Sequence, residues 1–204
     1  MTTRQLHYLS GLLLTAFIGV HLLNHAAALW GPEQHIAFMD TLRLAYRNPL
    51  VETLLLAAVA VQIFSGLRLF KGSRKKATKG FDRLHLWTGL YLALFLLVHV
   101  TAVLLGRTAL GLDTNFYFGV AGLNTFPFYF FFVPYYGLAV VSFFGHLAAV
   151  HQKKMQHSLL FLSPSGQALA LLLLGIGLAG LLLYGLTNQF EGVEIPAAYQ
   201  LTSP

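Results

Sequence analysis

Five long apolar segments dominate the sequence and limit what it can fold into. Each holds about the 20 apolar residues that a helix needs to cross the hydrocarbon core of a bilayer. They lie at residues 8–30, 49–70, 84–106, 134–151 and 166–187. Of the 204 residues, 56% are hydrophobic and only 10% are charged, whereas a soluble domain carries about 25% charged residues. The sequence therefore predicts an integral protein of the lipid bilayer and argues against a soluble enzyme or a nucleic-acid-binding protein.

The five segments are predicted to be helices, which makes the fold all-α. None shows the strict apolar–polar alternation of a membrane strand, and a helix satisfies its own backbone hydrogen bonds inside lipid. We expect a single transmembrane domain over residues 1–204. The first segment lacks a cleavage site of small residues, so we expect it to remain as a span. Because the chain has no cysteine, disulfides and thiolate-bound iron–sulfur or zinc sites are excluded.

The lysines and arginines predict the direction of the chain. With five spans, the N-terminus and the connections at 71–83 and 152–164 share one face, which holds ten of the thirteen Lys and Arg residues. They are Arg4, Arg68, Lys71, Arg74, Lys75, Lys76, Lys79, Arg83, Lys153 and Lys154. The positive-inside rule then predicts a multi-pass protein of the inner (plasma) membrane with a cytoplasmic N-terminus and an external C-terminus.

Two connections carry further expectations. The basic 71–83 loop either docks an acidic soluble subunit or is a topology signal alone. The 107–133 connection is rich in aromatic residues. We expect it to form a partly helical cap on the outer surface, with ordinary interfacial aromatics as the alternative.

An internal repeat contains four of the nine histidines. Residues 6–21, LHYLSGLLLTAFIGVH, and 84–99, LHLWTGLYLALFLLVH, are identical at eight of sixteen positions. The matches include His7 with His85 and His21 with His99. Fourteen helical residues turn about 1400°, close to four full turns, and rise about 21 Å. His21 and His99 are therefore predicted at one depth in the outer half of the membrane, and His7 with His85 at the inner boundary.

Paired imidazoles at one depth on parallel helices favour metal ligation. Haem b is the cofactor expected for His21 and His99, because it is apolar and its iron takes one imidazole on each side. Ser10, Gly11 and their repeat partners Thr88 and Gly89 are expected to let the flat macrocycle approach the backbone. The alternatives are interhelical hydrogen bonds and zinc, which usually takes three or four ligands and finds two here, with His25 as a third candidate.

The remaining histidines are less specific. His25, His35, His151 and His157 are expected mainly at the membrane interfaces. His146, between Gly145 and Leu147 in the inner half of the fourth span, is expected to be buried.

These motifs together resemble the five-helix cytochrome b membrane-anchor subunit of succinate dehydrogenase and fumarate reductase (complex II). The run LHYLSG…F…HLLNH at residues 6–25 is similar to the first helix of that family. HIAFMDTLRLAYRNPLVETLLL at 35–56 is similar to its first loop and second helix, and LHLWTG…F…H at 84–99 to its third helix. The resemblance covers roughly residues 4–151, and the fifth span matches only as an apolar segment.

The resemblance implies two b haems, and the chain departs from the family at one ligand position. His21 and His99 match the axial ligands of the outer haem, and His146 matches one ligand of the inner haem. Its partner in the family is a histidine four residues before a glycine, where this chain has Gln62 before Gly66. The inner haem is then absent, held one-sidedly by His146, or held by His7 and His85 as an alternative pair. One haem, two or none remain open.

The expected function is electron transfer in a membrane complex. The resemblance implies electron flow between an iron–sulfur subunit, the haems and a quinone, with the chain not catalytic alone but a subunit of a succinate:quinone oxidoreductase-like complex. Its partner on the inner face is a soluble dehydrogenase or iron–sulfur subunit, or another membrane complex. The alternative is a haem-free structural or assembly subunit of the same fold. A transporter is less supported, because the first, third, fourth and fifth spans lack acidic residues.

Overall fold

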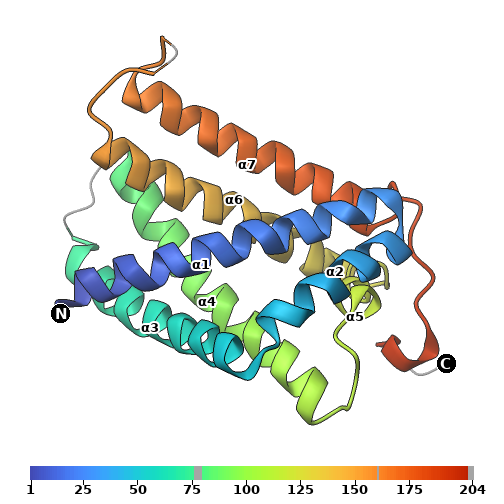
Figure 1. The fold of residues 1–204 in the computed structure, drawn as a ribbon. Coiled ribbons are helices and arrows are strands. Elements are labelled where there is room, and N and C mark those ends of the chain that lie inside the picture. The colour runs from blue at the N-terminus through green and yellow to red at the C-terminus, as the bar shows by residue number, and fades with distance from the viewer. Residues whose placement is uncertain (76–79, 160, 202–204) are drawn as a thin grey trace.

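The computed structural model describes residues 1–75, 80–159 and 161–201. Over these residues the ordered elements are helices, apart from one isolated β-bridge between Leu159 and Leu162 (Figure 1). Among the described residues, five helices are long and apolar enough to cross a membrane. They are α1 (Thr3–Ala26) with its extension η1 (Ala27–Trp30), α3 (Pro49–Ser73), α4 (Gly80–Thr108), α6 (Tyr129–Lys154) and α7 (Pro164–Leu186). The predicted all-α bundle of five membrane helices is confirmed.

Most spans begin earlier than the apolar segments predicted, because polar and turn-forming residues extend them. Thr2 caps α1, and its hydroxyl and the Gln5 side chain satisfy each other's backbone N–H groups in a capping box. α6 begins at Tyr129, more than a turn before Pro134. The carbonyl of Phe128 accepts hydrogen bonds from the N–H groups three and four residues later, so the helix is established before the proline, which lacks an N–H, is reached.

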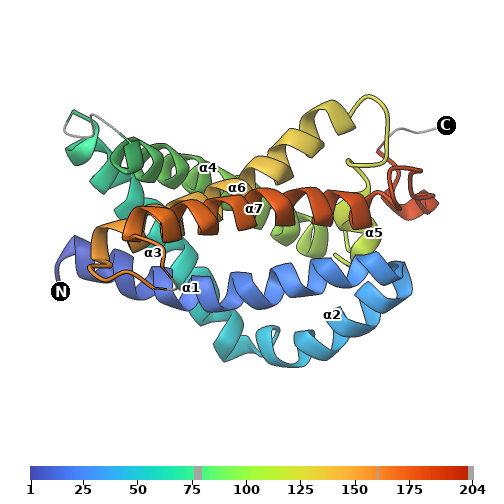
Figure 2. The same cartoon turned by 90° about the horizontal axis from the view of Figure 1, so that it is seen from above.

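The spans form a closed ring around a central space. α1 packs against α3, α3 against α4, α4 against α6, and α6 against α7, while α7 also contacts α1 and η1. α7 lies between α1 and α6 and bridges them (Figure 2). α1 and α4, which carry the repeat, run in the same direction along the bundle (Figure 1). The two copies of the repeat therefore lie on parallel helices, as expected.

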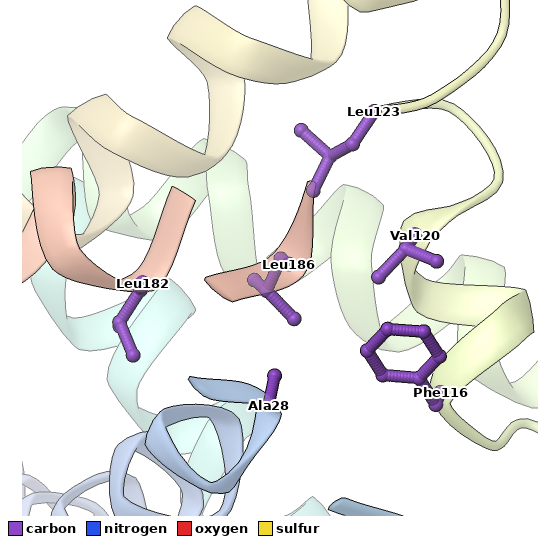
Figure 3. Packing of buried hydrophobic residues seen from close by; sticks show 6 residues of the cluster. All are labelled: Ala28, Phe116, Val120, Leu123, Leu182 and Leu186. Carbon is purple, nitrogen blue, oxygen red and sulfur yellow. The ribbon is translucent and has the colours of Figure 1, made fainter. Parts of the chain in front are cut away.

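Two shorter helices lie at one end of the bundle, and only the one in the 107–133 connection was expected. α2 (Pro32–Tyr46) follows η1 and folds back beside it, and α5 (Phe116–Val120) lies within the 107–133 connection, which is therefore partly helical. A cluster of buried apolar side chains joins α5, η1 and the end of α7 (Figure 3). Its members are Ala28, Phe116, Val120, Leu123, Leu182 and Leu186. We call this the cap end, and the opposite end, where α1 begins and α6 finishes at Lys154, the basic end.

The outward faces of the spans are apolar and exposed. Leu94, Leu97 and Leu105 on α4 and Leu173 and Leu174 on α7 each keep about half of their surface accessible. Large apolar side chains in such number on an outer face mark contact with something other than water. Together with the length of the helices, this indicates a multi-pass membrane protein whose outer faces lie against lipid.

Candidate functional site

The central space is a cavity of about 1420 Å³ along the bundle axis. Its lining includes Arg4 and Lys154 from the basic end and Glu52 and Arg107 from the cap end, with apolar side chains between them. Eight of the nine histidines line it, and His157 is the exception. The histidines of the chain are therefore gathered on one internal surface, which is the candidate site.

His21 on α1 and His99 on α4 lie close to each other in the half of the cavity nearer the cap end. Their ring centroids are 6.2 Å apart and their planes are inclined by 65°. Each ring stacks on the phenylalanine four residues earlier in its own helix. Phe17 lies 5.7 Å from His21 with planes 15° apart, and Phe95 lies 5.1 Å from His99 with planes 12° apart. The repeat thus produces the same local arrangement twice, and helix packing brings its two terminal histidines together.

The donor set and the space at His21 and His99 fit a haem b. Two metal–imidazole bonds of about 2 Å each place the ligating nitrogens roughly 4 Å apart, which a centroid separation of 6.2 Å accommodates. The surrounding cavity is lined mainly by apolar side chains from several helices. Zinc fits less well, because no group of three or more His, Asp or Glu side chains among the described residues is arranged to hold a metal ion.

His25 and His35 line the cavity and contact each other, an arrangement that the sequence did not predict; their depth in the membrane stays a prediction. His35 keeps only 2% of its surface accessible. Its Nε2 lies 3.2 Å from His25 Nδ1 and 3.2 Å from Asn24 Nδ2, and His25 Nε2 lies 3.1 Å from His21 Nε2. The reason is tertiary. The chain turns at Gly31, where φ is +107°, and α2 then brings His35 back over the end of α1.

This arrangement keeps His35 neutral. Burial, together with the charge that His21 and Arg43 would place nearby, lowers the pKa of His35 from 6.5 to about 4. Within the part of the chain that the structure describes, His35 Nδ1 and Asn24 Oδ1 are buried without a hydrogen-bond partner. A buried polar atom without a partner costs free energy, and a functional role is one explanation for it. His25, His35 and Asn24 therefore belong to the candidate site.

The histidines nearer the basic end form a second group. The rings of His85 and His146 are stacked, with centroids 4.3 Å apart and planes 29° apart. His7 bonds instead to α3, where its Nδ1 lies 2.9 Å from Ser65 Oγ. The structure therefore places His85 against His146 and joins His7 to α3. The ligand roles of these three residues stay predictions.

Gln62 on α3 and His146 on α6 occupy equivalent positions relative to the repeat. Ser10 donates a hydrogen bond of 3.1 Å to Gln62 Oε1, and a Cβ atom on Gly11 would lie 2.8 Å from Gln62 Nε2. In the second copy, Thr88 Oγ1 lies 3.4 Å from His146 Nδ1, and a Cβ atom on the glycine at 89 would lie 3.1 Å from His146 Cε1. The two glycines were expected to make room for a macrocycle. In the structure, Gly11 instead makes room for the Gln62 amide and Gly89 for the His146 imidazole.

His85 and His146 are not arranged to hold a second haem iron between them. The stacked rings of His85 and His146 are too close to flank an iron. The position equivalent to His146 is an amide, which is a poor iron ligand and already accepts a hydrogen bond from Ser10. Gln62 thus differs from the histidine that the resemblance implies, and its side chain is already engaged by Ser10.

Ion pairs border the cavity at its cap end. Arg43 of α2 lies 2.8 Å from Asp113, and Arg47 donates a 3.1 Å hydrogen bond to Thr114. The Glu52 carboxylate of α3 pairs with the Arg107 guanidinium of α4. These contacts fasten α2 to the 107–133 connection and α3 to α4, which holds the cap over the histidines.

Comparisons of the chain with protein-family models, with curated proteins and with solved structures find no match.

Proposed function

We propose that this chain is a haem b-binding membrane protein of electron transfer. The observation that carries the proposal is the approach of His21 and His99 across an apolar cavity from two parallel helices. Ionisable side chains within a membrane are expensive and usually functional. Two of them at one depth, in a space large enough for a flat cofactor, match the two-sided ligation of one haem iron.

The residues around the pair have defined tasks in this proposal. His21 and His99 hold the iron, and Phe17 and Phe95 fix the planes of the two imidazoles by stacking. Apolar side chains exclude water, which together with ligand identity sets the potential of a haem. Bound there, haem supplies one-electron transfer.

The resemblance to the complex II anchor supplies the wider setting of the proposal. The chain would pass electrons between a soluble iron–sulfur subunit at the basic end and a quinone, without catalysing a reaction alone. The basic end offers charge for such a partner, because Arg4, Lys71, Arg74 and Lys75 are exposed there. One haem is favoured over two, because Gln62 takes the position equivalent to His146.

A haem-free structural or assembly subunit is the second candidate. The observation in its favour is that several of the imidazoles already have protein partners. His21 contacts His25, His25 contacts His35, and His7 contacts Ser65. Neutral histidines that bond across helices stabilise a membrane bundle without any cofactor.

Optical spectroscopy of the purified protein tests the proposal. The dithionite-reduced minus oxidised spectrum should show a b-type α band with about one haem per chain. His99→Ala should abolish the haem or convert it to a five-coordinate, high-spin form. His157→Ala, at an exposed histidine outside the cavity, is the matched control and should leave the spectrum unchanged. A well-folded wild-type protein without haem would refute the proposal and favour the structural subunit.

A further inference from the structure

We propose that His25 is a second axial ligand on α1 that takes the place of His21 when His21 is removed. This inference rests on the proposed haem site and concerns a residue that the resemblance does not assign. On this inference α1 carries two imidazoles that can bind the iron, whereas α4 carries one. Three features support it, namely the placement of the two rings, the contacts of His25 with its neighbours, and the asymmetry of the repeat.

The two imidazoles of α1 reach the same point of the cavity. His25 lies four residues after His21, so both side chains project from one face of the helix. Side chains of an α-helix lean toward its N-terminus, which carries the His25 ring back over the turn that bears His21. The result is a separation of 3.1 Å between the two Nε2 atoms and 4.5 Å between the ring centroids. A change of ligand therefore relocates the ligating nitrogen by only 3.1 Å.

The contacts of His25 allow its Nε2 to bind a metal once His21 is gone. A neutral imidazole carries one N–H and one lone pair. His25 Nδ1 lies 3.2 Å from His35 Nε2, and His25 Nε2 lies 3.1 Å from His21 Nε2. In the tautomer with the His25 proton on Nδ1, that proton points to His35 and the Nε2 lone pair points to His21. Removal of His21 then frees this lone pair for a metal.

His35 supplies the support that a metal-binding histidine usually has. Ligating histidines almost always donate their other ring N–H to a fixed acceptor, which sets tautomer and orientation. Here that acceptor is the buried His35, held by Asn24 and packed against Phe116 at 5.1 Å between ring centroids. The positioning residue comes from α2, which folds back over the end of α1.

The second copy of the repeat has no second imidazole next to His99 on α4. The residue four positions after His99 is Val103, and the residue four positions before it is Phe95. Neither side chain carries a nitrogen. Loss of His99 therefore leaves α4 without an imidazole at this depth, whereas loss of His21 leaves α1 with His25.

Four variants of the full chain test the inference: His21→Ala, His25→Ala, the double variant with both changes, and His99→Ala. The readouts are haem per chain, the spin state of the ferric form by electron paramagnetic resonance, and the midpoint potential. Each single α1 variant should keep a low-spin haem near the wild-type amount, with a shifted potential in His21→Ala. The double variant and His99→Ala should both lose the low-spin signal.

The outcomes separate this inference from the proposed function. If His21→Ala loses the low-spin signal as completely as the double variant, His25 is not a replacement ligand, while the haem site stands. If His99→Ala keeps a low-spin haem, or the wild type binds none, the site itself is refuted. His21→Gln repeats the test with a polar side chain in place of a void, in case the alanine variant is not monodisperse.

Discussion

The contact between α6 and α7 gives the sharpest prediction about the bundle itself. Gly175 of α7 faces Phe144 of α6 so closely that a Cβ atom on the glycine would lie 2.3 Å from Phe144 Cβ. Carbon atoms in contact prefer about 3.5–4.0 Å, so Gly175→Ala creates an overlap of more than about 1 Å. Because the atom that it meets is itself a Cβ, a change of rotamer cannot relieve the overlap, and the two helices must move apart.

The expected cost follows from that overlap. Forcing one extra methyl group into a close-packed contact typically costs about 1–3 kcal/mol, which corresponds to about 5–150-fold in the folding equilibrium. Gly177→Ala is the matched control on the same helix, because nothing lies within 4 Å of its Cβ position. That change should be neutral or stabilise the protein by up to about 1 kcal/mol, since alanine is the better helix former.

The measurement is reversible unfolding of both variants in detergent, followed by circular dichroism as denaturing detergent is added. Gly175→Ala should unfold at clearly lower denaturant than wild type, and Gly177→Ala should not. Equal stability of the two variants would show that α6 and α7 do not pack through Gly175, and the arrangement of the ring would have to be revised.

Three further predictions concern the site, the topology and pH. If His146 holds an inner haem, His146→Ala should lower the haem content and leave the signal of the His21–His99 haem, whereas an unchanged content and spectrum would leave His146 as a packed, hydrogen-bonding residue. A reporter fused to the C-terminus should lie outside the cytoplasm and one inserted between residues 71 and 79 inside, and a cytoplasmic C-terminus would contradict the predicted direction. Because the pKa of His35 is lowered from 6.5 to about 4, the folded state disfavours its charged form. The stability that His35 contributes is therefore present above pH 6.5 and lost as the pH falls toward 4. His35→Gln should flatten this part of the dependence of unfolding free energy on pH. An unaltered dependence would show that His35 is not buried in its neutral form.

The spans were predictable because lipid imposes a simple rule on sequence. About 20 apolar residues in a row have few alternatives to a membrane helix, and the structure has helices over all five segments. The parallel course of the two helices that carry His21 and His99 was also predictable from the internal repeat, whereas the packing that brings the two rings together was not. The helix ends were less predictable than the spans, because capping by Thr2 and the turn before Pro134 depend on local hydrogen bonds.

The surroundings of His25 and His35 were not predictable, because they are created by a tertiary contact. α2 is short and of mixed polarity, and nothing in its pattern shows that it folds back over α1. The position of His25 one turn after His21 was a usable signal, but its meaning depends on His35. In the same way, the family resemblance pointed to Gln62, whereas its equivalence to His146 is visible only through the contacts of the two with Ser10 and Thr88.

The bridging position of α7 has a consequence for biosynthesis. α1 and α6 are joined mainly through α7, which packs against both and follows the other spans along the chain. During insertion, α1, α3, α4 and α6 therefore enter the bilayer before the helix that closes the ring between α1 and α6. For that interval the histidine-lined cavity is open sideways to lipid, and a flat apolar ligand can enter between α1 and α6. Docking of α7 then closes this route, so a ligand that uses it has to enter before α7 docks.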